Sequence, residues 1–212
     1  MSSRVVVNAA WADAYEDGAA TTFQGTGLTF GYDAFTTVEE AIANVASGGC
    51  VQIVAGNYEA PGGEWVVTKP MAILGWQAAN EGDVALSGTI RVGGIAVGSL
   101  LVGNLVITSA DDSKAALVVD DGVGTVVCLN SVLVGKAAAV QIGVYTGGVT
   151  LQNNDIVADG AGVRCVRSGG QAAPSGLLYM GGNAFEGSKL MEDNGFPYLL
   201  DKNLFNGEEA GN

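Results

Sequence analysis

Tyr32 to Tyr58, with the sequence YDAFTTVEEAIANVASGGCVQIVAGNY, is the stretch that decides the fold. It begins with a helix-start signal, because Thr36 with Glu39, or Thr37 with Glu40, has the spacing of a capping box. In that motif the hydroxyl and the carboxylate bond to backbone N–H groups that the first turn of a helix leaves free. Either pair places the beginning of a helix within the same two residues.

The predicted helix has one narrow apolar stripe. Its members are spaced at i, i+3, i+4 and i+7, and they are Val38, Ala41, Ile42 and Val45. The sequence Ser47-Gly48-Gly49 ends the helix, since glycine adopts the left-handed conformation that a helix C-terminus needs. Residues 50–54 then read as a strand. A short helix with one apolar stripe has to cover an apolar surface, so we predict a lid on the strands that follow.

The composition favours a globular protein built from short strands. Of 212 residues, 48% are hydrophobic but only 7% are aromatic, and small β-branched residues suit stacked strands. Only 4 prolines occur, which argues against a Pro-rich disordered chain. The net charge of −13 argues against binding to nucleic acid or to an anionic membrane, because phosphate contacts need clustered Lys and Arg. No apolar run is long enough to be inserted across a membrane.

The sequence contains no histidine, which excludes histidine-activated nucleophiles, histidine acid–base catalysis and histidine-bound zinc. Three cysteines, Cys50, Cys128 and Cys165, are too few and too scattered for a disulfide framework. Each stands among apolar strand residues, so we predict buried free thiols and leave open a bridge between one pair. We expect no cofactor and no dedicated metal site, and weakly held Ca²⁺ on the acidic surface is the alternative.

Short strands recur in the second half of the chain, and an asparagine marks each repeat. Apolar residues flank it in LVGNLVI, VVCLNSVL and VTLQNNDIV, and weaker copies follow. The repeated residues are Asn104, Asn130, Asn154, Asn183 and Asn203. Short strands that repeat at the spacing of these asparagines, with no helix between them, are typical of a β-solenoid, in which each coil completes the sheets of the next. We predict that these side chains point inward and bond from coil to coil as a ladder. Ordinary turn asparagines are the alternative.

These patterns predict a single all-β domain over residues 1–212. An N-terminal strand, a loop and the capping α-helix occupy residues 1–49, solenoid coils occupy residues 50–186, and a C-terminal cap occupies residues 187–212. Both ends of such a stack need covers, because open sheet edges pair with other chains. The sequence therefore predicts a parallel β-solenoid with a short N-terminal capping helix.

The stretch AFTTVEEAIANVASGGCVQIVAGNYEA, residues 34–60, resembles the N-terminal cap of the right-handed parallel β-helix proteins of the pectin lyase-like superfamily. The continuation VVTKPMAILGWQAANEG, residues 66–82, resembles the next two strands of that group. In detail the sequence is most similar to β-helix modules of large bacterial surface proteins of the adhesin type. The resemblance implies a right-handed parallel β-helix. It does not decide function, because the superfamily includes lyases, hydrolases, phage tailspikes and catalytically silent adhesins.

Candidate catalytic residues are few. The polygalacturonase-like pattern that the resemblance brings to mind needs a His-Gly and an Arg-x-Lys, and the sequence has neither. Asp120-Asp121 is the acidic doublet at the end of a repeat strand, and its two side chains point to opposite faces if the strand runs through both. Asn153-Asn154-Asp155 is similar to an Asn-Thr-Asp motif, but Asn154 fits the ladder better.

Two other sets of residues remain as candidates. A lyase-like site would use Arg164 or Arg167 as a base beside Asp155 and Asp159 with Ca²⁺, and a solvated surface ion pair is the competing interpretation. Aromatic rings that stack on sugars are the other kind, namely Trp11, Trp65, Trp76, Tyr145 and Tyr179. We expect Trp65 to lie in the core and Tyr145, in a glycine-rich loop, to be the most exposed.

Three inserts are expected to leave one side of the solenoid and to carry the binding site: Ser109–Lys114, Gly143–Gly148 and Val166–Gly176. We predict a non-catalytic extracellular or cell-surface module for adhesion or structural presentation, with a glycan or a surface protein as partner and no catalytic residue to name. The alternative is a carbohydrate-active β-helix, either polysaccharide lyase- or hydrolase-like or a tailspike-like receptor binder of a virion. Oligomeric state and residual enzymatic activity are left open.

Overall fold

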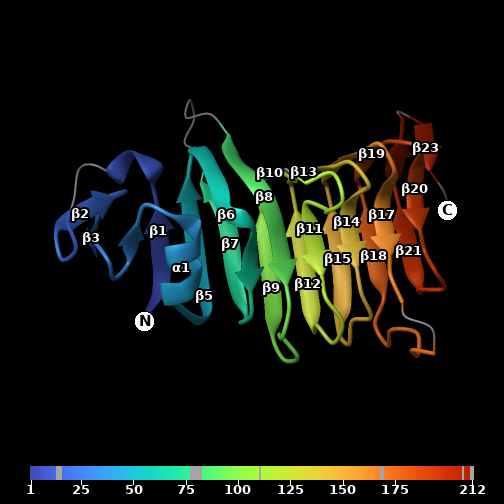
Figure 1. Cartoon of the computed structure of the whole chain (residues 1–212), viewed down its shortest axis with the longest axis horizontal. Helices are drawn as coiled ribbons and strands as arrows, with labels where there is room; N and C mark the ends of the chain where they lie inside the picture. The colour runs from blue at the N-terminus through green and yellow to red at the C-terminus, as the bar shows by residue number, and fades with distance from the viewer. Residues whose placement is uncertain (13–15, 77–82, 110, 168–169, 207, 211–212) are drawn as a thin grey trace.

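The computed structural model describes residues 1–12, 16–76, 83–109, 111–167, 170–206 and 208–210, and it is a right-handed parallel β-helix of about seven turns (Figure 1). One wall, sheet A, has nine parallel strands in the order β21-β18-β15-β12-β9-β7-β5-β1-β4. They are β1 (Ser2–Val7), β4 (Ala34–Phe35), β5 (Val45–Val54), β7 (Met71–Trp76), β9 (Ser99–Gly103), β12 (Thr125–Leu129), β15 (Gly148–Gln152), β18 (Leu178–Gly181) and β21 (Tyr198–Asp201).

The other two walls share two long strands, β6 (Gly56–Val67) and β8 (Val84–Val92), and then separate. Sheet B continues with β10 (Val106–Thr108), β13 (Val132–Gly135), β16 (Asp155–Ala158), β19 (Ala184–Glu186) and β22 (Asn203–Phe205). Sheet C continues with β11 (Leu117–Val119), β14 (Ala138–Ile142), β17 (Ala161–Cys165) and β20 (Lys189–Glu192). Parallel pairing thus extends beyond residue 186, and among the described strands of these walls only β23 (Glu208–Ala210) departs from it, lying antiparallel on β22.

Each coil runs from sheet A to B to C, and the corner between A and B has a left-handed residue. Asn104, Asn130 and Asn153 have φ of 57°, 49° and 54° there, a conformation that asparagine tolerates better than most residues. The next residue in each coil points into the solenoid. The prediction of inward side chains is therefore wrong for Asn104 and Asn130, which are exposed turn residues.

The ladder exists one position further along, in Ser131, Asn154, Asn183 and Asn203, which are all buried. Asn154 Nδ2 donates to Asn183 Oδ1 at 3.0 Å, and Asn183 Nδ2 donates to Asn203 Oδ1 at 2.9 Å. The same oxygens also accept backbone N–H groups of the preceding rung. The predicted ladder is confirmed for Asn154, Asn183 and Asn203.

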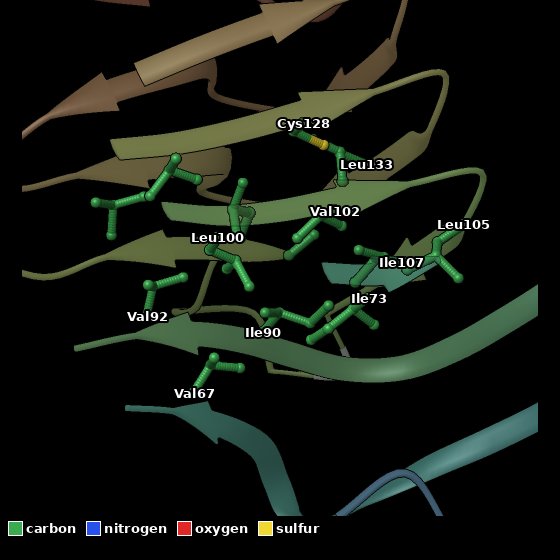
Figure 2. Packing of buried hydrophobic residues seen from close by; sticks show 14 of the residues in the cluster. Val67, Ile73, Ile90, Val92, Leu100, Val102, Leu105, Ile107, Cys128 and Leu133 are labelled. Carbon is green, nitrogen blue, oxygen red and sulfur yellow. The ribbon is translucent and has the colours of Figure 1, made fainter. Parts of the chain in front are cut away.

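Aliphatic side chains from the three walls fill the interior (Figure 2). They stack in rows because parallel strands hold equivalent residues opposite each other; Ile73, Val102 and Cys128 form one such row. All three cysteines are free, and Cys128 and Cys165 are buried as predicted. Cys50 differs, because it points to the outer face of sheet A and is only half-buried.

The predicted lid is helix α1 (Val38–Asn44), which packs on β1, β5 and β6 at the N-terminal end of the stack. Of the two capping pairs the structure selects the second, because Thr37 Oγ1 accepts the N–H of Glu40 and bonds to its carboxylate. The helix is shorter than predicted. Val45 is already extended and begins β5, so Gly48, with φ of 77°, lies within that strand instead of ending the helix.

An N-terminal arm covers the outer face of sheet A over its first strands. It comprises the 3-10 turn η1 (Ala9–Trp11) and the hairpin of β2 (Ala20–Phe23) and β3 (Thr26–Thr29). Trp11 and Leu28 pack against Val6 and Val54, which are outer residues of β1 and β5. In the part of the chain that the structure describes, no helix is long and apolar enough to cross a membrane.

Candidate functional site

The outer face of sheet C carries polar side chains in register from coil to coil. Strand pairing aligns Val66, Arg91, Val118, Gln141, Arg164 and Glu192 in one row across the strands. Neighbouring members of such a row lie about 4.8 Å apart, because that is the distance between paired strands. The row therefore presents donors and acceptors along the solenoid axis, with Val66 and Val118 as its two apolar members.

The predicted inserts border this face on both sides instead of leaving one side of the coil. The described residues of Ser109–Lys114 lie at the corner between sheets B and C, whereas Gly143–Gly148 and the described residues of Val166–Gly176 lie at the corner between C and A. Residues 110, 168 and 169 of these inserts lie outside the described residues. The described residues of the last two inserts contact each other, since Ser175 Oγ donates to the carbonyl oxygen of Thr146. Sheet C is thus the one wall that all three inserts adjoin.

Ion pairs link the N-terminal half of the row. Arg91 Nε donates to both carboxylate oxygens of Asp120, at 3.2 and 2.8 Å. Glu64 lies between two cations, with Lys114 Nζ at 2.7 Å and Arg91 Nη1 at 3.9 Å. Each charged side chain of this N-terminal group has an opposite charge beside it. The group therefore offers hydrogen-bonding atoms without a strong net electrostatic field.

A second group of charges occupies the C-terminal half. Arg164 Nε donates to Glu192 at 2.9 Å, and Lys189 Nζ approaches the other oxygen of that carboxylate at 3.2 Å. These two cations lower the pKa of Glu192, the hydrogen bond from Arg164 being the main cause. Gln141 lies in the row between the two charged groups, with Arg164 as its partner on the next strand.

A cleft of about 470 Å³ opens at the N-terminal end of the face, between α1 and β6. Its lining includes carboxylates, a cation and the edge of an indole: Glu39, Ile42, Ala43, Pro61, Glu64, Trp65, Val66, Thr68 and Lys69. Trp65 Nε1 donates to Glu39 at 3.3 Å, and Lys69 Nζ donates to the carbonyl oxygen of Ala43 at 2.8 Å, near the C-terminus of the helix. Glu64 connects this cleft to the charged row.

A second cleft, of about 370 Å³, lies where β11 and β14 end. It is lined by Val119, Asp120, Asp121, Gln141, Gly143 and Val166. The condition for the two aspartates to point to opposite faces is not met, because β11 ends at Val119 and the alternation of a strand does not apply beyond it. Glycines make room for both carboxylates: a Cβ at Gly93 would approach Asp120, and one at Gly143 would approach Asp121, to within 3 Å.

Asp121 is held by two hydrogen bonds from the loops of neighbouring coils. The side chain of Gln171 and the N–H of Val144 each donate to it at 2.8 Å. Both bonds favour the ionised form and lower the pKa of Asp121, with the bond from Gln171 contributing most. Asp121 is therefore a fixed, charged acceptor at the mouth of the cleft.

The residues of the predicted lyase-like site are not brought together. Asp155 begins β16 on sheet B, with Val132 and Ala184 as strand neighbours, whereas Arg164 lies on sheet C and pairs with Glu192. Asp159 contributes to raising the pKa of Lys136, another residue of the corner between B and C. Asn154, from the motif beside Asp155, is buried in the ladder.

The aromatic candidates also differ from expectation. Trp65 is in the core as predicted, but Tyr145 is only 1% exposed, so the prediction that it is the most exposed is wrong. Its ring turns into the solenoid and packs against Phe196, with ring centroids 5.9 Å apart, and burial raises the pKa of its hydroxyl to about 12. Among the residues that the structure describes, the most exposed rings are Tyr32 and Tyr198, at 54% and 44%, and neither was among the predicted sugar-stacking candidates.

Within the described ranges, no cluster of three or more Cys, Asp or Glu side chains has the arrangement of a metal site. Weak Ca²⁺ binding stays a hypothesis, for which Asp120 and Asp121 are two carboxylates that line one cleft.

Comparison with known proteins gives matches of structure alone. No family model and no curated protein matches the sequence. Among solved structures, the chain is similar to pectin methylesterase PemA from Erwinia chrysanthemi, with 11% identity, a TM-score of 0.48, and coverage of 100% of this chain and 91% of that one. A pectin methylesterase in complex with hexasaccharide VII follows at 12% identity and 0.46, covering 98% and 90%. The Aspergillus niger pectin methylesterase in deglycosylated form has 12% identity and 0.44, covering 98% and 87%.

Proposed function

We propose that the outer face of sheet C binds an extended glycan that runs across the coils, parallel to the solenoid axis. The observation that carries this proposal is the in-register row through Arg91, Gln141 and Arg164, with a cleft at its N-terminal end and another beside its centre. A polymer that crosses these strands meets a polar side chain at four of the six strands of the row, with Val66 and Val118 as its apolar members. The ion pairs of Arg91 and Arg164 already restrict those two side chains, so they lose less entropy on binding.

The charges of the row favour hydroxyl groups as ligands. Guanidinium and ammonium groups only donate, and carboxylates only accept, so alternating them suits a chain of hydroxyls that does both. Because the cations are already paired with Asp120, Glu64 and Glu192, they add little attraction for a polyanion. The net charge of −13 also repels one. A neutral glycan is therefore favoured over an acidic one.

Binding without turnover is favoured over hydrolysis. A glycosidase needs one carboxyl group whose pKa is raised so that it can donate a proton to the leaving group, beside a second carboxylate that is ionised. The lowered pKa of Asp121 suits the ionised role and not that of the proton donor. We infer a binding module that acts outside the cell or on a surface, and the carbohydrate-processing enzyme is the second candidate because two carboxylates share one cleft.

A panel of neutral polysaccharides, pectate, alginate and host-type glycans tests the proposal, with affinity measured by calorimetry and products by chromatography. Gln141→Ala removes the amide at the centre of the row, so affinity should fall about fivefold, the equivalent of one hydrogen bond of about 1 kcal/mol. Gln152→Ala, an exposed glutamine on sheet A, is the matched control and should bind like the parent.

Each outcome distinguishes the candidates. Absence of binding to every glycan, or equal losses in Gln141→Ala and Gln152→Ala, would refute the binding face. Bond cleavage that is lost in Asp121→Asn but retained in Asp155→Asn would establish the enzymatic candidate instead. Repeating the measurements with millimolar Ca²⁺ and with a chelator tests the cation hypothesis, which requires that the added Ca²⁺ raise affinity.

A further inference from the structure

The cleft between α1 and β6 lies where the polar row of sheet C ends. Strand β6 is the first strand of that wall, and Val66 is the first member of the row. On the N-terminal side of β6 no further strand of sheet C is described, and α1 packs there instead (Figure 1). A glycan that follows the row in this direction therefore meets the helix.

The cleft is bounded on three sides. Its far wall consists of the α1 residues Glu39, Ile42 and Ala43. Pro61 bounds it at the corner between sheets B and C, where the pairing of β6 with β8 is irregular, and Thr68 and Lys69 bound it at the corner between C and A. The remaining side continues into the row through Val66, which is 53% exposed. The volume of about 470 Å³ is typical of a small-ligand pocket, so the cleft accommodates the end of a glycan and not a long segment.

Two charged groups of the cleft have neutral partners, unlike the ion-paired charges of the row. Glu39 Oε2 accepts the indole N–H of Trp65 at 3.3 Å, and Trp65 is almost fully buried, so the indole holds the carboxylate in place. Lys69 Nζ donates to the carbonyl oxygen of Ala43 at 2.8 Å. Within the described part of the chain, the other carboxylate oxygen of Glu39 takes part in no hydrogen bond. The cleft thus offers a positioned acceptor and a positioned donor, the combination that suits a hydroxyl group.

We propose that this cleft binds the terminal sugar residue of a neutral glycan, whose following residues extend along the row from Val66 toward Glu192. The proposal rests on the function proposed for sheet C and adds that the glycan is recognised by its end. A terminal residue has a free hydroxyl where an internal residue carries the next glycosidic bond. Glu39 and Lys69 bind this hydroxyl, and Ile42 and Val66 supply apolar surface for the C–H groups of the ring. An internal residue does not fit, because the continuing chain would collide with α1.

The stoichiometry of binding tests end recognition, because it counts the protein molecules that each glycan chain takes up. Short and long fractions of linear galactan, mannan and amylose are titrated with the whole protein by calorimetry. A glycan that binds should take up one protein molecule per chain in both fractions. A number that increases with chain length would show that internal segments bind, and would overturn this proposal while leaving the function of sheet C intact. Absence of binding to all three glycans would overturn both.

The two ends of the glycan are distinguished by borohydride reduction, which opens the sugar ring at the reducing end alone. Loss of binding after reduction would assign the reducing end to the cleft, and retained binding would assign the non-reducing end. Either result, with one protein molecule per chain, supports recognition of a terminal residue.

Substitutions in α1 test the cleft itself. Glu39→Gln keeps an acceptor for the indole of Trp65 but removes the charge, so affinity for the short fraction should fall about fivefold. The matched control is Glu40→Gln, the same substitution at the next residue of α1, which lies outside the cleft. It should bind like the parent, because glutamine also completes a capping box.

Ala43→Trp fills the cleft from an exposed position of the helix and should abolish binding of the short fraction. Circular dichroism checks that this variant is folded, and Glu39→Gln decides if it is not. Equal affinities of Glu39→Gln and Glu40→Gln, or undiminished binding by folded Ala43→Trp, would overturn the proposal. If Gln141→Ala still lost affinity in that case, the function of sheet C would stand without end recognition.

Discussion

Asn183→Leu tests the internal ladder, because leucine keeps the branched shape of asparagine and removes its hydrogen bonds. Asn183 is 1% exposed and makes four side-chain bonds. Its oxygen accepts the N–H and the Nδ2 of Asn154, and its Nδ2 donates to the carbonyl oxygen of Leu151 and to Asn203. All four partners lie in the neighbouring coils, so the substitution affects the contact between coils directly.

The partners do not all lose their last bond. Asn154 Nδ2 still donates to the carbonyl oxygen of Cys128, and Asn203 Oδ1 still accepts the N–H of residue 183. The N–H of Asn154 is left facing an apolar side chain, which costs about 1–3 kcal/mol for a buried donor. With the loss of the remaining bonds, partly offset by the more apolar side chain, we expect a decrease of about 2–4 kcal/mol in the free energy of unfolding.

Urea unfolding followed by far-UV circular dichroism measures this difference, and the melting temperature should fall by about 4–16 °C for a domain of this size. Asn130→Gly is the matched control. That asparagine has the same flanking pattern in the sequence but is exposed with φ of 49°, where glycine fits, so its substitution should change stability by no more than about 0.5 kcal/mol. Equal unfolding midpoints for the two variants would show that the inward bonds do not stabilise the stack.

Three further predictions concern the lid, the thiols and acid stability. Ile42→Asp should destabilise the protein by about 2–5 kcal/mol, because it places a charge at the buried contact of α1, and a melting temperature within a degree or two of the parent would contradict the lid. Cys50 should be the thiol that reacts with Ellman's reagent in the native protein, since burial raises the pKa of Cys128 and of Cys165 to about 12. Rapid reaction of all three thiols in the absence of denaturant would contradict this prediction. Asp121 has a lowered pKa in the folded state, so its contribution to stability is present above about pH 4 and is lost as the pH falls through the folded-state pKa. In Asp121→Asn the urea midpoint should therefore depend less on pH over that range than it does in the parent. An unchanged dependence of the midpoint on pH would contradict the hydrogen bonds to Asp121.

The sequence predicts those features of the fold that repeat or that follow from local chemistry. The capping residues and the apolar stripe are sufficient to place α1, and the recurrence of apolar triplets is sufficient to indicate stacked coils. The position of the ladder is off by one residue in two coils for a physical reason. Asparagine is favoured both at a left-handed corner and at the inward position that follows it, so Asn130 and Asn154 look equivalent in sequence although they occupy successive positions in the structure.

The candidate site depends on register, which a single sequence does not contain. In the sequence, 50 residues separate Arg91 from Gln141 and 23 separate Gln141 from Arg164. Only the strand pairing shows that the three residues form one row. The same holds for Asp121, whose partner Gln171 comes from a loop two coils further along. Tyr145 shows the opposite error: a glycine-rich loop indicates exposure, but its ring is buried and packs against Phe196, and Gly143 and Gly147 lie where a Cβ would clash with the preceding coil.

The three walls of the solenoid can be assigned separate roles because each coil contributes to each wall through different residues. Inward positions are occupied by the aliphatic rows and the ladder, and they change only at a cost in stability. Outward residues are not under that constraint, so the amino-acid composition of an outer face reflects whether the face contacts solvent, a ligand or another protein surface. The outer row of sheet C has three charged residues, one amide and two valines and is bordered by the described residues of all three inserts, whereas the outer rows of sheet A are mostly aliphatic or glycine, with Thr150, Tyr179, Gln152 and Asp201 as their polar members. If solvent alone acted on both walls, their outer rows would have similar composition. The difference between them is the reason to seek a hydroxyl-rich ligand on sheet C.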